Sequence, residues 1–392
     1  MRTISLYVHF PFCRSKCAYC DFNSVVADEG LRQRYLQALQ DDITRTGNTL
    51  TFRIGEDEPP VRPAEPELLV TTIYFGGGTP TLFAAEELCA TLSRIRRAFP
   101  VITRPEVTVE ANPGTVTAEG LALLREMGFN RLSLGVQSLL DDELRLLGRC
   151  HTAAEARRAV AEARAAGFEN LSLDLISALP GQSVGAWQAT LHDALHLQPE
   201  HISCYGLSLE KDTPLARAVE GGQMAPPDED TLVEMYELTH RLLTGAGYEH
   251  YEIANYALPG YQCRHNVNYW RNGEYLGLGA GAWSYLAGRR MKHEADPTRW
   301  VEKSERGLPT LTEIEELDER QRAGEAIMLA LRTAEGLDLT ELQSRYHLDP
   351  DRYSIRLKAL VESGLALDVA GRLVLHPVHG FLLQSEIAQM FM

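Results

Sequence analysis

The chain has no apolar run that approaches the roughly 18–20 residues of a membrane-spanning helix. It begins with Met1–Ile4 and passes directly into an expected strand, without the apolar core of a secretory signal. Basic residues are also scarce, because 38 Lys and Arg face 54 Asp and Glu, for a formal net charge of −16. This balance argues against bulk binding to nucleic acid, which needs a basic face. We therefore expect a soluble protein with no nucleic-acid partner.

Cysteine is sparse along most of the chain. Four of the seven cysteines stand singly, at Cys89, Cys150, Cys204 and Cys263, and a buried thiol accounts for most of them. No C-x-x-C-H occurs, so covalent attachment of a c-type heme has no support. Without a secretory signal, these thiols predict a reducing, cytosolic compartment.

The other three cysteines form one group near the start of the chain. Cys13, Cys17 and Cys20 have C-x3-C-x2-C spacing and follow a short apolar run that predicts a first strand. Thiolates suit iron–sulfur clusters and zinc, and a structural zinc site needs four protein ligands. The next ligand position along the chain is Phe22, which cannot bind a metal. The spacing therefore favours a cluster in which one iron remains open.

Three different roles compete with a cluster for these cysteines. Burial as core thiols is disfavoured by the neighbouring charges of Arg14 and Lys16. A disulfide would leave an odd thiol and needs an oxidising compartment. Zinc, with His9 as the fourth ligand, stays open as the serious alternative.

Helical and strand patterns alternate over the first 250 residues, which predicts a parallel sheet with helices packed outside it. Six such units favour an α/β fold with an incomplete (β/α)6 barrel; a full eight-stranded barrel and an open doubly wound sheet stay open. Residues 46–66 are expected to form an irregular insertion. After the first strand, the expected strands are 71–75, 106–110, 131–137, 171–176 and 202–207, and the expected helices are 31–43, 84–98, 117–127, 142–166 in two parts, 184–197 and 229–244.

The pattern changes from about residue 248, where a strand-rich extension is expected. Residues 265–283 are typical of turns, and 313–317 and 318–332 of helices. Beyond them, 337–346, 351–364, 365–368 and 372–375 suggest a small α+β unit of the winged-helix type. We expect two domains, 1–300 and 301–392.

In a barrel and in an open parallel sheet alike, active and ligand-binding sites lie at the carboxyl ends of the strands. The cysteine loop, the turn Gly76–Gly78, Glu110, Gln137 and Asp174 all fall at such ends. Glycine lets a backbone approach a neighbour closely because it has no Cβ. The glycine turn matches neither the P-loop nor the dinucleotide fingerprint. These residues are therefore expected to meet in one site.

The cysteine spacing at the tip of a first strand resembles the radical S-adenosylmethionine (SAM) superfamily. The longer strings around it, Tyr7–Cys13 and Tyr19–Phe22, are similar to the oxygen-independent coproporphyrinogen III oxidase-like family and, within it, to HemW-type heme chaperones. The resemblance implies a radical-SAM barrel, a C-terminal domain like that of the oxidase, and a [4Fe–4S] cluster on Cys13, Cys17 and Cys20. It also implies SAM contacts at Tyr7, Tyr19, Gly77, Gly78, Thr79, Glu110, Gln137, Arg149, Asp174, Ser208 and Trp283. For Arg149, Ser208 and Trp283, an exposed charge, a turn hydroxyl and a packed indole are the alternative roles.

A second motif concerns heme. The segment His265–Trp270 resembles the H-N-x-x-Y-W signature of HemW-type proteins, and imidazole is a usual axial ligand of heme iron. We take His265 as the candidate heme contact and Cys263 as a weaker second candidate; a hydrogen bond within the turn is the alternative role of His265.

The oxidases of this family carry a fourth cysteine and an N-terminal extension, whereas this chain has Phe22 at that position and twelve residues before Cys13. Both departures favour a cytosolic heme chaperone that delivers heme to an acceptor, such as a respiratory, membrane-associated protein. The alternatives are the oxidase, a radical-SAM enzyme of heme breakdown, and a zinc-stabilised barrel. The sequence leaves open whether SAM is cleaved and which oligomeric state forms.

Overall fold

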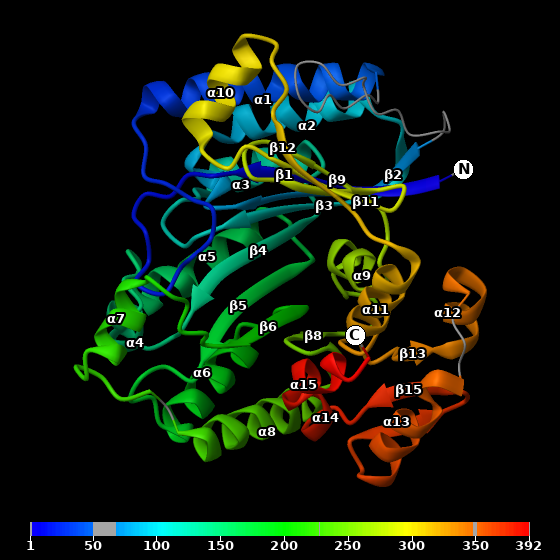
Figure 1. Ribbon diagram of the computed structural model, residues 1–392. Coiled ribbons are helices and arrows are strands. Elements are labelled where there is room, and N and C mark those ends of the chain that lie inside the picture. Colours follow the sequence, from blue (N-terminus) through cyan, green and yellow to red (C-terminus); the bar gives the residue numbers. More distant parts are fainter. Residues whose placement is uncertain (1, 50–67, 227, 348–350, 392) are drawn as a thin grey trace.

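The computed structural model describes residues 2–49, 68–226, 228–347 and 351–391. Its main element is a twelve-stranded sheet in the order β12-β11-β10-β9-β1-β2-β3-β4-β5-β6-β8-β7 (Figure 1). The central six strands are parallel and follow one another in chain order. They are β1 (Arg2–Phe10), β2 (Leu68–Gly77), β3 (Val101–Ala111), β4 (Arg131–Gln137), β5 (Leu171–Ser177) and β6 (His201–Gly206).

The strands have two different faces because successive side chains point to opposite sides of a sheet. On β4, Leu132, Leu134 and Val136 join the hydrophobic core beneath the helices. The alternate residues, Arg131 and Ser133 among them, line a cavity on the other face. The inner face of the sheet is therefore polar, and the outer face is apolar.

Helices connect the parallel strands and cover the outer face. Local signals fix their starts: Thr152 and Glu155 form a capping box at the beginning of α5. Most expected helices are confirmed within a few residues, but α7 was not expected. The connecting helices are α1 (Glu29–Thr49), α2 (Ala85–Ala98), α3 (Ala118–Glu126), α4 (Asp141–Leu146), α5 (Ala153–Ala165), α6 (Val184–His196), α7 (Pro214–Glu220) and α8 (Glu229–Gly245), with the short 3-10 helix η1 (Pro80–Leu82).

The barrel is incomplete, as expected, because β1 and β6 do not pair with each other and each is extended by other strands. From β1 outward, the sheet continues with β9 (Tyr275–Leu278), β10 (Trp283–Leu286), β11 (Arg289–His293) and β12 (Leu311–Glu316). From β6 outward, it continues with β8 (Asn255–Ala257) and β7 (Glu249–Glu252). Of these, β9 is parallel to β1, whereas β8 runs antiparallel to β6.

Two expected elements are wrong. Residues 313–317 are not helical, because Leu311–Glu316 pairs with β11 along its length; sheet pairing overrides the helical tendency of its glutamates. In the expected turn region 265–283, residues 265–270 instead belong to the helix α9 (Arg264–Trp270), and residues 275–278 form a strand that pairs with β1. Of the expected insertion at 46–66, residues 46–49 end α1, and the remainder lies outside the described residues.

The C-terminal part has its own hydrophobic core, which begins at Ala323 and includes Phe391. The last strand of the main sheet, β12, ends at Glu316. The helix α10 (Pro297–Glu305) precedes this strand in the chain and packs on α1. A domain boundary near 300 stays a prediction. The small unit consists of α11 (Glu319–Ala330), β13 (Leu337–Asp338), α12 (Leu339–Tyr346), α13 (Asp351–Glu362), β14 (Ala366–Val369), β15 (Arg372–Leu375), α14 (His379–Leu382) and α15 (Gln384–Gln389), and its three strands form a sheet of their own. Over the described residues, no helix has the length and apolar character needed to span a bilayer.

Candidate functional site

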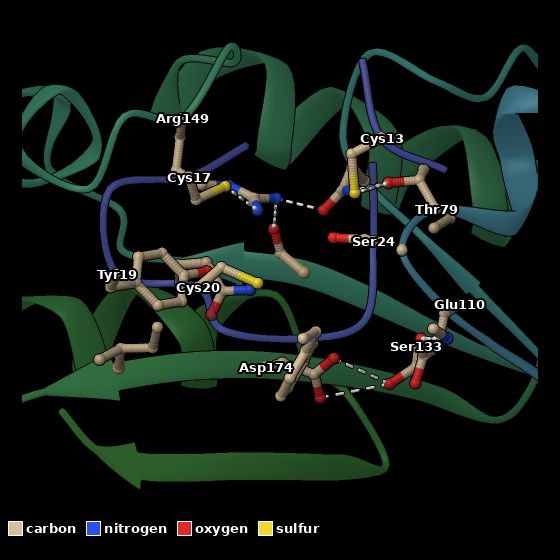
Figure 2. A pocket seen from close by; sticks show the side chains of 18 of the residues that line it. Cys13, Cys17, Tyr19, Cys20, Ser24, Thr79, Glu110, Ser133, Arg149 and Asp174 are labelled. Carbon is tan, nitrogen blue, oxygen red and sulfur yellow. Dashed lines mark hydrogen bonds between the residues drawn. The ribbon is translucent and has the colours of Figure 1, made fainter. Parts of the chain in front are cut away.

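A cavity of about 480 Å³ opens at the carboxyl ends of the parallel strands. This volume lies within the range of small-molecule pockets, roughly 300–1,000 Å³. The cavity brings together most of the residues that the sequence singled out, from the cysteine loop to the end of β6 (Figure 2). These residues are Cys13, Cys17, Tyr19, Cys20, Gly77, Gly78, Thr79, Glu110, Gln137, Arg149, Asp174 and Ser208.

The cysteine loop is closed by backbone pairing at its two ends. Val25 accepts a hydrogen bond from the N–H of Cys13 at 3.0 Å and donates its own N–H to Pro11 at 2.9 Å. Two side chains then donate to the thiols: Arg149 Nη1 lies 3.4 Å from Cys17 Sγ, and Thr79 Oγ1 lies 3.8 Å from Cys13 Sγ. Three thiols and their donors are thus held on one wall of the cavity.

The donor set fits an iron–sulfur cluster. Among the described residues, no three His, Cys, Asp or Glu side chains converge as the ligands of one metal ion. A cubane does not need such convergence, because each thiolate binds a different iron. Burial raises the pKa of Cys20, and the neighbouring Cys17 and Cys13 raise it further. Bound iron would favour the thiolates.

The glycine turn is packed against the cysteine loop. Gly78 donates its N–H to Phe10 at 2.8 Å, and a Cβ on Gly78 would lie 2.5 Å from the carbonyl oxygen of Phe12. Gly77 has φ of +115°, and a Cβ there would lie 2.6 Å from the ring of His9. The glycines are therefore needed for close approach between β1 and β2, which places Thr79 beside Cys13.

Two strand carboxylates line the cavity: Glu110 next to the end of β3, and Asp174 in the middle of β5. Glu110 accepts from Tyr74 Oη at 2.7 Å and from the N–H of Gly77 at 3.1 Å, and burial raises its pKa to about 7. Asp174 accepts from Ser203 Oγ at 2.8 Å and from Ser133 Oγ at 3.0 Å. Burial raises the pKa of Asp174 despite these hydrogen bonds. Both carboxylates are oriented by their donors while lining the cavity.

Arg149 lies in the break between α4 and α5. Its Nη2 donates to Gly135 O at 2.7 Å and to Asn112 Oδ1, while Nη1 faces Cys17. The guanidinium is thus fixed across the cavity wall, where it can bind a carboxylate as well as stabilise a thiolate. The exposed-charge alternative for Arg149 is wrong, because the side chain lines the cavity and has these partners.

Sequence reasoning missed several residues that share this wall. Tyr74, Asn112, Ser133, Ser203 and Ser24 all line the cavity. The available signal was the period of two along each strand, since Ser133 precedes Gly135 and Gln137 on the same face.

Three predicted contacts do not line the cavity. Tyr7 is half-buried, with its hydroxyl 3.0 Å from His9 Nδ1 and its ring stacked on Tyr74. Trp283 lies on β10, with the ammonium of Lys292 5.1 Å from its ring centre. The SAM contacts of Tyr7 and Trp283 stay predictions.

His265 is the third predicted contact that does not line the cavity. Its ring is buried, with Nδ1 2.7 Å from Thr72 Oγ1 and Nε2 2.8 Å from Tyr269 Oη. Burial lowers its pKa to about 3. Glu106 accepts the N–H groups of Arg264 and His265 at 3.0 Å each and so begins α9. In this conformation both ring nitrogens already have partners.

Cys263 precedes the same helix and is also buried. Its thiol donates to Glu106 Oε1 at 3.7 Å, and burial raises its pKa to about 12. Asn266, which follows His265 in the H-N-x-x-Y-W segment, does line the cavity. The H-N-x-x-Y-W segment therefore contacts the cavity through its asparagine rather than its histidine.

Comparison with known proteins agrees with this geometry. Residues 7–194 match the Radical SAM superfamily, and residues 317–383 match the HemN C-terminal domain. The structure of coproporphyrinogen III oxidase (HemN) from Escherichia coli superposes with a TM-score of 0.83 at 23% identity, covering 100% of this chain and 90% of that one. Fold and site define a radical-SAM protein with a HemN-like architecture, and a radical SAM domain implies a [4Fe–4S] cluster and SAM.

The sequence relatives narrow this class. Heme chaperone HemW of Escherichia coli (strain K12) is 40% identical over 71% of this chain and 69% of its own length. Heme chaperone HemW of Lactococcus lactis (strain IL1403) is 32% identical over 99% of this chain and 97% of its own. The chain belongs to the HemW family.

Proposed function

We propose that this protein is a heme chaperone, which binds heme and passes it to an acceptor protein, and which carries a [4Fe–4S] cluster and SAM. The observation that carries the proposal is the similarity to proteins named heme chaperone HemW over 71% of the chain in one case and 99% in another. The cysteine loop supports it, because Phe22 stands where the oxidases have a fourth cysteine.

The cavity supports the cofactor assignment residue by residue. Cys13, Cys17 and Cys20 would hold three irons and leave the fourth open to a ligand. When bound, the cluster supplies that open coordination position and a centre for one-electron transfer. Thr79 and Arg149 donate hydrogen bonds to the thiolates and so lower the cost of their charge.

The remaining polar groups suit the amino acid and ribose parts of SAM. Glu110 and Asp174 present carboxylate oxygens to ammonium or hydroxyl donors, and Gln137 presents an amide. The guanidinium of Arg149 suits a carboxylate. Tyr19 lines the same cavity and offers a ring for stacking on an adenine.

For heme we retain His265 as the proposed iron ligand. Because Thr72 and Tyr269 occupy both ring nitrogens, ligation requires that one of these hydrogen bonds be exchanged for iron. Thr72 lies on β2, whereas Tyr269 lies on the same short helix as His265, so a movement of α9 away from β2 would release Nδ1. The heme-bound protein is therefore expected to differ from this conformation at α9.

The test of the function is a heme titration of the anaerobically reconstituted protein, followed by a transfer assay. A Soret band that saturates with heme, and moves to an apo-acceptor with its pigment intact, is the expected result. No heme uptake would contradict the proposal. Formation of protoporphyrinogen would identify an oxidase, and loss of heme with reductant and SAM a heme-degrading enzyme. The acceptor and a cytosolic location are part of the proposal; all seven cysteines are free, as a reducing compartment allows.

A further inference from the structure

The hydroxyl of Ser24 lines the cavity and has no partner. The residue is 5% exposed, and within the described part of the chain its Oγ makes no hydrogen bond. Figure 2 shows its side chain directed into the cavity among the labelled residues. A buried hydroxyl without a partner is unfavourable, so a group that completes this hydrogen bond is expected in the occupied site.

The backbone on both sides of Ser24 is held firmly. Asn23 donates its side-chain amide to Ala295 O at 3.0 Å and receives His9 Nε2 at 2.9 Å on its own carbonyl. Val25 pairs with the segment Pro11–Cys13. The hydroxyl of Ser24 is therefore presented from a fixed position beside the cysteine loop, which is the condition for an effective preorganised donor.

The neighbouring thiols show which ligand this donor suits. Cys13 receives Thr79, and Cys17 receives Arg149. Cys20 receives the backbone N–H of Phe22, and within the described residues no side chain donates a hydrogen bond to it. On the side of the cavity formed by the cysteines, two thiols thus have side-chain donors, and the nearby hydroxyl of Ser24 has no partner in the described structure.

We propose that Ser24 donates a hydrogen bond to a sulfur of the iron–sulfur cluster, either a sulfide or a cysteine thiolate, and thereby raises its reduction potential. The inference rests on the proposed cluster. Reduction adds negative charge to the cluster, so a donor aimed at a sulfur stabilises the reduced form more than the oxidised form. Ser24 is a positioning residue in this account, because it acts on the potential without providing a ligand.

The experiment is a redox titration of the reconstituted cluster, followed by electron paramagnetic resonance without SAM. Ser24→Ala removes the hydroxyl, and the pair Ser24→Thr and Ser24→Val repeats the comparison at constant volume should the alanine variant fold poorly. We expect Ser24→Ala, and Ser24→Val relative to Ser24→Thr, to lower the reduced-to-oxidised ratio at fixed potential about tenfold (~59 mV for one electron).

The matched control is Ser15→Ala, which removes another hydroxyl of the cysteine loop that already pairs with Cys150 Sγ at 2.9 Å; its potential should equal that of the wild type. Equal potentials with and without the Ser24 hydroxyl would overturn the inference. Weaker SAM binding at unchanged potential would also overturn it and assign the hydroxyl to SAM. A wild-type protein without iron and sulfide would instead refute the cofactor proposal itself, whereas a failed heme titration leaves this test intact.

Discussion

The cavity at the strand ends and the helix α9 contain the two motifs most typical of the family, yet their side chains are bonded differently. At the cavity, Ser24 and Arg149 have nitrogen or oxygen atoms without partners in the described structure. At α9, Trp270 Nε1 also lacks a partner among the described residues, but His265 has partners on both ring nitrogens, and Glu106 accepts the first N–H groups of the helix. The cavity is therefore ready for a ligand as it stands, whereas α9 must rearrange before His265 can bind iron.

The largest expected effect tests the cavity. Cys17→Ser should abolish the cluster, because two thiolates cannot retain a cubane that three hold. Iron and sulfide analysis after anaerobic reconstitution measures this. Cys89→Ser is the matched control, since Cys89 is buried on α2 away from the cavity; an equal loss of iron in both variants would contradict the assignment.

A smaller effect is expected at Arg149. Arg149→Ala should weaken SAM binding about 10- to 100-fold, because a charge-assisted hydrogen bond contributes about 1.5–3 kcal/mol. Equilibrium dialysis on the reconstituted protein provides the measurement. Arg145→Ala removes an exposed arginine paired with Asp142 on α4 and should leave binding unchanged; unaltered affinity in Arg149→Ala would show that this arginine has a structural role only.

The comparison is sharpened at α9 by two substitutions. His265→Ala should lower heme affinity at least about tenfold through the loss of an iron ligand. Tyr269→Phe should raise heme affinity, because it frees Nε2 without removing the ring that packs on His265. Heme titration at the Soret band measures both. If His265→Ala binds heme as the wild type does, the heme ligand lies elsewhere.

The smallest effect concerns pH. Burial raises the pKa of Glu110 from its ordinary 4.5 to about 7, so the carboxyl is protonated below neutrality and ionised above it. SAM affinity should therefore rise about fivefold as pH increases through 7, since an ionised acceptor binds donors more strongly. The same shift affects the free energy of unfolding. Because the folded state holds the proton of Glu110 more tightly than the unfolded state, the contribution of Glu110 to stability falls as the pH rises from 4.5 to 7. Glu110→Gln should remove the pH dependence of binding; a dependence that persists would belong to another group.

Much of the fold could be predicted because the parallel strands are local segments with alternating apolar residues, such as Arg131–Gln137, bounded by turns. The helix α9 could not be predicted, since its start depends on Glu106, 158 residues before Arg264. The strand β12 was misassigned because its acidic residues suit a helix until β11 pairs with them. Distant partners decide both elements.

The site divides in the same way. The cysteines, Glu110, Gln137 and Asp174 were predicted to share one cavity because they end successive strands. Ser24 was missed, since a lone serine after a cysteine loop has no pattern that marks it. A hydrogen bond of His265 within its own segment was among the expected alternatives, and Tyr269 makes it. The second partner, Thr72, was missed because it lies on β2, far from the motif in sequence.

The central claim is that three thiols hold an iron–sulfur cluster with one iron open to SAM. The most direct measurement is anaerobic reconstitution with metal and sulfide analysis, followed by electron paramagnetic resonance of the reduced protein before and after SAM is added. We predict about four irons and four sulfides per chain, and a spectrum that changes with SAM. Bound zinc without sulfide, or a cluster spectrum indifferent to SAM, would contradict this account.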